Sequence, residues 1–199
     1  MITNVGFSLS FLGLLFLLDY YFTLLNYRLY QVKMKSFVET EHFELNPEFQ
    51  KDVYAGKYRI VHALRVLLIL LALFGLHAAE RIFGPVLGFI GLNESMYLLS
   101  VATLLSAVLL IIFQHVRGLL LFRTFNRIPN LVSGHIMHTY RFDLESSKSE
   151  ALAMTMVFVV VFIISPSVVT MGLALGPLLM FFQFQYWIKL AATKVKISQ

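Results

Sequence analysis

Long runs of apolar residues, separated by shorter polar stretches, dominate the hydropathy pattern of the chain. A helix of about 20 apolar residues crosses the roughly 30 Å hydrocarbon core of a bilayer. Three runs have that length, at residues 5–30, 60–79 and 96–116. Each of these runs therefore predicts one transmembrane helix.

A fourth apolar run, residues 151–188, is too long for one ordinary span. It is interrupted by Ser165-Pro166-Ser167, and a proline disfavours helix in the residue before it. The run therefore predicts two helices, at 151–165 and 168–188, with a tight turn between them.

The pattern as a whole predicts an all-α fold: a polytopic integral membrane helical bundle of about five transmembrane helices. The bundle forms a single membrane domain over residues 1–199, with cytoplasmic loops at 31–59 and 117–150. A shorter apolar segment, residues 82–92, cannot span a bilayer. Because it contains Gly84-Pro85, we expect it to break from helix and either lie at the outer interface or dip partly into the bilayer.

Composition supports a membrane protein rather than a soluble domain. Hydrophobic residues make up 58% of the chain and charged residues 14%, whereas a soluble domain carries about 25% charged residues. The chain has no cysteine, which excludes disulfides, thiolate catalysis and iron–sulfur ligation. No nucleotide-binding, zinc-protease or serine-hydrolase motif is present, and nothing in the sequence indicates a cofactor.

The distribution of basic residues predicts the orientation of the chain. With five helices, 14 of the 16 lysines and arginines fall on one side, and only Arg65 and Arg81 do not. Because basic residues concentrate in cytoplasmic loops, we expect the N-terminus outside and the C-terminus inside the membrane. The same residues suit anionic lipid headgroups of the inner leaflet, and they argue against nucleic acid as a partner.

Asp19 interrupts the first apolar run and raises the main functional question. A carboxylate at that depth costs about 2.5–3.5 kcal/mol on insertion scales. Asp19, Thr23 and Asn26 recur at i, i+4 and i+7, so they share one helix face, which must contact other helices or water. His62 and Arg65 lie at a similar depth on the second helix, which predicts an Asp19–Arg65 ion pair.

Further polar side chains on later helices extend this set to an inner-leaflet polar site. Such a site either binds a ligand or holds the helices together, since interhelical hydrogen bonds contribute about 0.6 kcal/mol on average. The sequence leaves both readings open. The residues of this predicted site are Asp19, Thr23, Asn26, His62, Arg65, Gln114, Arg117 and Gln183.

Two short motifs appear together in the first quarter of the chain. Asp19 and Thr23 form an Asp-x-x-x-Thr pattern in the first helix, and Glu44, Asn46 and Pro47 form Glu-x-Asn-Pro in the following loop. This combination resembles uncharacterised small prokaryotic integral membrane proteins. The resemblance implies a location in a prokaryotic cytoplasmic membrane and no particular reaction.

A weaker candidate for metal binding lies in the second predicted loop. His135 and His138 are spaced i, i+3 and could share a helix face, with Asp143 or Glu145 as a carboxylate ligand. Without a third ligand at a fixed offset the motif is of low specificity.

These observations favour a non-enzymatic membrane protein, a small accessory or binding subunit that works with a protein partner or as a homo-oligomer. The alternative is a small oligomeric transporter or channel subunit that uses Asp19. A third possibility, an intramembrane enzyme, would require Asp19, Glu44, His62 or His135 to come together.

Overall fold

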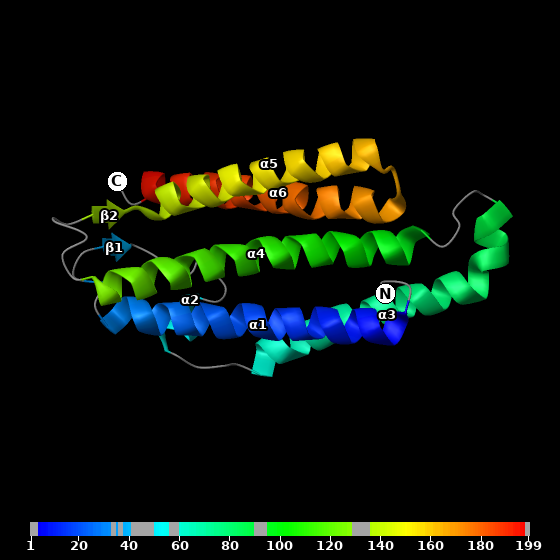
Figure 1. Ribbon diagram of the computed structural model, residues 1–199, viewed down its shortest axis with the longest axis horizontal. Coiled ribbons are helices and arrows are strands. Elements are labelled where there is room, and N and C mark those ends of the chain that lie inside the picture. Colours follow the sequence, from blue (N-terminus) through cyan, green and yellow to red (C-terminus); the bar gives the residue numbers. More distant parts are fainter. Residues whose placement is uncertain are drawn as a thin grey trace. The chain divides into compact units, whose positions relative to one another are not determined.

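The computed structural model describes most of the chain. The described residues are 4–32, 35, 38–40, 50–55, 60–89, 95–128 and 136–197. Its elements in chain order are α1 (Val5–Val32), β1 (Val38–Thr40), α2 (Gln50–Tyr54), α3 (Ile60–Phe89), α4 (Ser95–Arg127), β2 (Ile136–His138), α5 (Tyr140–Ile164) and α6 (Val168–Ile197) (Figure 1).

Among the described residues, five helices are long and apolar enough to cross a membrane, which confirms the predicted class of multi-pass helical membrane protein. Their candidate spans are Val5–Val32, His62–Gly84, Met96–Thr124, Tyr140–Ile164 and Val168–Leu190. The direction in which the chain crosses the membrane stays a prediction.

One short strand pairing departs from a purely helical fold. Strand β1 pairs in parallel with β2, with Val38 opposite Ile136 and Thr40 opposite His138. The segment that follows α1 and the segment that precedes α5 therefore lie side by side, as expected for two loops on the same face of a membrane.

The turn between α5 and α6 lies at Ser165-Pro166-Ser167 and is closed by a capping box. The Ser167 amide donates to the Thr170 Oγ1 (3.0 Å), and the Thr170 amide donates to the Ser167 Oγ (3.1 Å). Because these contacts satisfy amides that have no partner at a helix start, they set the beginning of α6.

The predicted break at Gly84-Pro85 is wrong. Helix α3 continues through both residues to Phe89, bending in its last turns (Figure 1). A proline removes one backbone hydrogen bond, and the usual clash with the Cβ of the preceding residue is absent because that residue is Gly84. A helix of 30 residues accommodates this loss as a bend.

The predicted loop over residues 117–150 is also much shorter in the structure. Helix α4 runs on to Arg127, because the first proline after the start of this helix is Pro129. Helix α5 begins at Tyr140, where the Thr139 Oγ1 accepts from the Phe142 amide at 3.2 Å as an N-cap. Most of the polar residues assigned to this loop are therefore helical.

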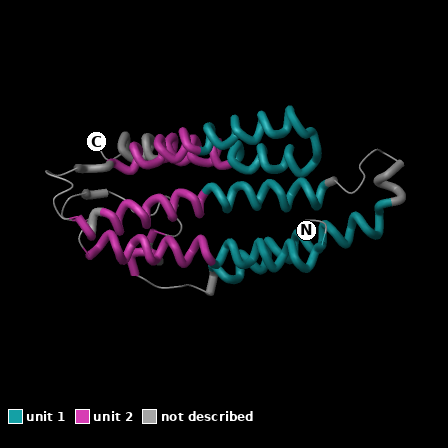
Figure 2. Tube along the Cα trace, viewed as in Figure 1, with its two compact units in different colours: residues 1–17, 59–110, 151–179 teal, residues 18–58, 111–150, 180–199 magenta. Residues whose placement is uncertain are grey.

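The chain divides into two compact units, and α1, α4, α5 and α6 each contribute to both (Figure 2). Unit 1 comprises residues 1–17, 59–110 and 151–179. Unit 2 comprises residues 18–58, 111–150 and 180–199.

Within unit 1, the core consists of Leu12, Leu73, Tyr97 and Val101, from α1, α3 and α4. Helices α4 and α6 approach closely at Gly172 and Gly176. A Cβ on Gly176 would lie 2.3 Å from the Thr103 carbonyl oxygen, so only glycine permits this approach.

The start of α4 is capped from another helix of the same unit. The Glu80 Oε1 accepts from the Tyr97 backbone amide at 2.6 Å. The His77 ring packs on the Tyr97 ring, with centroids 5.0 Å apart. A carboxylate at a helix N-terminus also interacts favourably with the helix dipole. This contact therefore ties α3 to the beginning of α4.

Candidate functional site

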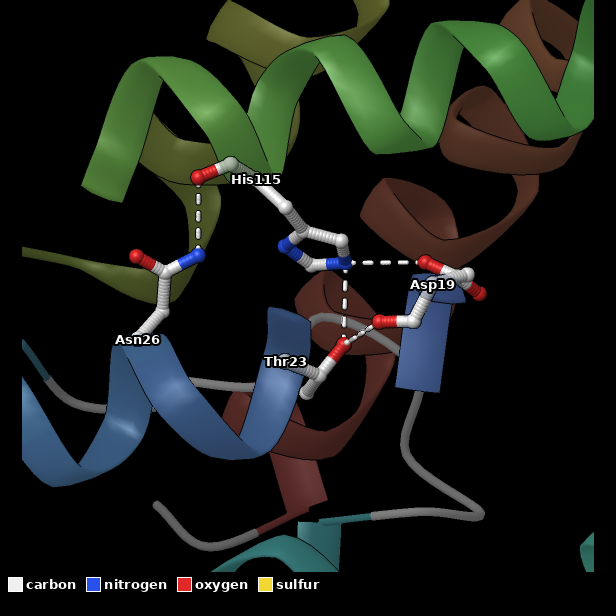
Figure 3. A network of polar contacts seen from close by, with 4 residues as sticks. All are labelled: Asp19, Thr23, Asn26 and His115. Atoms are coloured by element: carbon white, nitrogen blue, oxygen red, sulfur yellow. Dashed lines mark hydrogen bonds and ion pairs between the residues drawn. The ribbon is translucent and has the colours of Figure 1, made fainter. Parts of the chain in front are cut away.

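The polar face of α1 in unit 2 meets α4 at His115 (Figure 3). The His115 Nε2 lies 3.0 Å from the Asp19 Oδ1 and 2.9 Å from the Thr23 Oγ1. One helical turn further on, the Asn26 Nδ2 donates to the His115 carbonyl oxygen at 2.8 Å. Three residues spaced i, i+4 and i+7 on α1 thus contact a single residue of α4.

The direction of the hydrogen bond between Thr23 and His115 depends on which ring nitrogen carries a proton. The single hydroxyl hydrogen of Thr23 is donated to the Asp19 carbonyl oxygen, at 3.0 Å. Toward His115, the Thr23 oxygen can therefore only accept. With the hydroxyl in this orientation, the matching tautomer of His115 carries its proton on Nε2 and donates to Thr23.

The Asp19 carboxylate lies beside this donor without receiving a hydrogen bond from it. Its buried Oδ1 lies 3.0 Å from the His115 Nε2, within ion-pair distance of a protonated ring, yet it has no hydrogen-bond partner. The side chains of Asp19 and His115 are 19% and 22% exposed. A buried acceptor without a partner costs about 1–3 kcal/mol.

Asn26 closes the cluster toward the end of α1. The residue is 2% exposed, and the hydrogen bond from its Nδ2 sets the orientation of the amide. Its Oδ1 points toward Gly118 of α4 and is buried without a hydrogen-bond partner. Asn26 therefore contributes a second unsatisfied acceptor to the α1–α4 interface.

A second polar cluster joins α4 to α5 in the same unit. The Gln114 Nε2 donates to the Glu150 Oε2 at 2.9 Å, and the Arg117 Nη1 forms an ion pair with the Glu150 Oε1. Both carboxylate oxygens of Glu150 thus have partners. The Arg117 side chain is 57% exposed. This cluster has the contacts of a staple between two helices.

The structure brings together some residues of the predicted site and leaves others apart. Asp19, Thr23 and Asn26 form one cluster, whereas Gln114 and Arg117 belong to the α4–α5 cluster. On α6, Gln183 is exposed.

Asp19 belongs to unit 2, whereas His62 and Arg65 belong to unit 1. His62 is buried on α3, and Arg65 is exposed. The predicted Asp19–Arg65 ion pair stays a prediction, and the ion pair that the structure describes for Asp19 is with His115.

The two loop motifs fall largely outside the described residues. Glu44, Asn46, Pro47 and His135 lie in segments that are not described, and His138 is described only as part of the β2 backbone. Within the described residues, no three histidines, aspartates or glutamates are grouped closely enough to hold a metal ion.

Two residues of the clusters, His115 and Glu150, were not predicted from the sequence. The helical spacing of Gln114 and Arg117 suggested a single polar face on α4, but His115 follows Gln114 directly and lies about 100° around the helix. His115 and Gly118, spaced i, i+3, lie on a second face of α4, and Asn26 of α1 contacts both residues. Glu150 was assigned to a loop, although α5 already includes it.

Comparisons with known proteins add no family assignment. No protein-family model matches the chain, and neither the search of curated proteins nor the search of solved structures found a match. The functional argument therefore depends on the geometry of the α1–α4 cluster.

Proposed function

We propose that this multi-pass membrane protein is a non-enzymatic binding or accessory subunit, and that its ligand site is the α1–α4 cluster of Asp19, Thr23, Asn26 and His115. The described part of the chain consists mainly of apolar helices, which insertion into a lipid bilayer explains. A buried polar cluster is not needed for insertion, so it calls for another role. The predicted participation of Arg65 belongs to the same proposal.

One observation carries the proposal: the buried Asp19 Oδ1 has no hydrogen-bond partner although the His115 Nε2 lies 3.0 Å away. A purely structural staple satisfies its polar groups, as Glu150 does with Gln114 and Arg117. At Asp19, the Thr23 Oγ1 lies 2.9 Å from the same His115 nitrogen and competes with the carboxylate for it. The Asp19 Oδ1 can therefore still accept a hydrogen bond from another partner.

The chemistry of the open groups defines the class of ligand. Asp19 offers a carboxylate whose Oδ1 is buried, while the side chain as a whole remains 19% exposed. A negatively charged acceptor inside a membrane favours a cation that donates hydrogen bonds. A small ammonium group, free or on a lipid headgroup, has this chemistry.

The proposal is tested by thermal unfolding of the purified chain in methylammonium chloride and in tetramethylammonium chloride at equal ionic strength. Both cations carry one charge, but only methylammonium has N–H donors. We expect methylammonium alone to raise the Tm, because a ligand at 100 times its Kd stabilises the folded state by about 2.7 kcal/mol.

The matched controls for this experiment are Asp19→Asn, which removes the charge, and Glu145→Gln, which does so outside the cluster. Asp19→Asn should abolish the difference between the two salts, whereas Glu145→Gln should retain it. Equal Tm values in both salts for the unmodified chain contradict a donor-binding site. Free amine and lipid headgroup are distinguished by repeating the measurement in phosphatidylethanolamine and phosphatidylcholine bilayers.

A second candidate function, a small oligomeric transporter or channel subunit, is favoured by a different observation. Asp19 and His115 are two titratable groups from different helices, 3.0 Å apart inside candidate spans. Such pairs inside membranes mark proton relays in pumps and transporters. Proton flux into liposomes that contain the chain tests this role, and flux that Asp19→Asn leaves unchanged removes it.

A further inference from the structure

One face of α6 remains exposed along the C-terminal half of the helix. Phe182, Gln183 and Tyr186 are all exposed, at 58% for Phe182 and 62% for Tyr186. Leu190, one turn beyond Tyr186, continues the same face at 38% exposure. Phe184, which points to the other side of the helix, is 3% exposed. The exposed positions therefore form a stripe and not a frayed end.

Gln183 makes this stripe unlike a surface that faces only lipid. It lies inside the candidate span Val168–Leu190, seven residues or about 10 Å from its end. A glutamine side chain has two donor hydrogens and an acceptor oxygen, and lipid tails offer no partner for any of them. Within the described residues, no hydrogen bond engages this side chain.

We propose that the stripe Phe182–Gln183–Tyr186–Leu190 is the surface through which two copies of this chain associate. A carboxamide is complementary to itself, because the donor of one copy meets the acceptor of the other across a twofold axis. A polar side chain facing its own copy is a common way to hold transmembrane helices together. The flanking positions supply aromatic and aliphatic area for packing around that hydrogen-bonded pair.

A second copy accounts for this surface better than a charged partner does. Gln183 is neutral, and its three nearest neighbours on the stripe are also uncharged. Complementary charge therefore has no role at its centre. The inference is independent of the proposed ligand site, because it depends on α6 alone.

The chain contains no cysteine, so single-cysteine variants report contacts without a background thiol. We expect Gln183→Cys and Tyr186→Cys to form disulfide-linked dimers when the chain is oxidised in bilayers. Gln185→Cys, on another face of the same helix, is the matched control and should remain monomeric. Equal cross-linking at all three positions, or none at any of them, overturns the proposed interface.

A second measurement removes the hydrogen bond instead of trapping the contact. Energy transfer between labelled copies in liposomes gives the monomer–dimer equilibrium of the full chain. Gln183→Leu should raise the dissociation constant about 3-fold to 20-fold, the range expected for one interhelical hydrogen bond. Gln185→Leu should leave it unchanged. A dissociation constant that responds equally to both substitutions, or to neither, contradicts the role of Gln183.

Discussion

Asp19 of α1 and His115 of α4 approach to 3.0 Å, and the same His115 nitrogen forms a hydrogen bond with Thr23. The carboxylate that interrupts the first apolar run is thus placed against a second helix. The consequences of this arrangement can be measured in stability, hydrogen exchange and spectroscopy.

The Asp19–His115 contact should appear as coupling between the two residues. Asp19→Leu and His115→Leu each leave a polar partner inside the membrane, so each should lower the free energy of unfolding by about 1–3 kcal/mol. The double variant removes both groups and should cost less than the sum, with a coupling of about 0.5–3 kcal/mol. Equilibrium unfolding in lipid–detergent micelles measures the cycle, and strictly additive effects contradict the contact.

The Thr23 hydroxyl should be required as the acceptor for the His115 N–H. Thr23→Val keeps the shape of the side chain but removes the oxygen, so stability should fall by about 0.5–1.5 kcal/mol. Thr23→Ser keeps the hydroxyl and is the matched control. The same unfolding measurement tests the pair, and a valine variant as stable as the serine variant would show that this hydrogen bond contributes nothing.

The close approach of α4 and α6 should make Gly176 intolerant of any side chain. A Cβ there would lie 2.1 Å from the Ser106 Oγ and 2.3 Å from the Thr103 carbonyl oxygen. Gly176→Ala should therefore cost about 1–3 kcal/mol of stability, because the helices must separate.

Gly75→Ala provides the comparison for Gly176→Ala, since a Cβ at Gly75 meets nothing within 4 Å. That substitution should be neutral or raise stability by up to about 1 kcal/mol, as alanine is the better helix former. Thermal unfolding of both variants decides the question. A Gly176→Ala variant that unfolds no earlier than Gly75→Ala is incompatible with this packing.

The helix cap that Glu80 provides should slow hydrogen exchange at the Tyr97 amide. Glu80→Ala removes the acceptor 2.6 Å from the Tyr97 amide, and loss of such a cap costs about 0.5–2 kcal/mol. Hydrogen exchange at the Tyr97 amide should therefore accelerate in this variant. Glu80→Gln retains an acceptor oxygen and should keep most of the protection. Unchanged exchange in Glu80→Ala would mean that the start of α4 is held in another way.

The apolar runs contain most of the information that determines the helical fold. The length of the runs and the proline at 166 were enough to predict five membrane-capable helices and the turn between α5 and α6. The continuation of α3 through Gly84-Pro85 could not be predicted this way. The rule that glycine and proline end a helix considers only neighbouring residues. It does not compare the one hydrogen bond that Pro85 removes with the many hydrogen bonds of a 30-residue helix.

The polar face of α1 was predictable because Asp19, Thr23 and Asn26 recur with helical spacing. Their partner was not, because helical periodicity shows which side chains share a face and not which helix that face contacts. Adjacency along the chain favoured Arg65 on the next helix, whereas the described contact comes from His115 on α4. Finding His115 required the packing of helices that are distant in sequence.

The most direct test of the central claim is solid-state NMR on the chain in lipid bilayers, with ¹³C-labelled aspartate and ¹⁵N-labelled histidine. We predict a strong dipolar coupling between the Asp19 carboxyl carbon and the His115 Nε2, and a chemical shift that identifies Nε2 as the protonated nitrogen. A protonated Nδ1 with an unprotonated Nε2, or no coupling between these two atoms, would contradict the account.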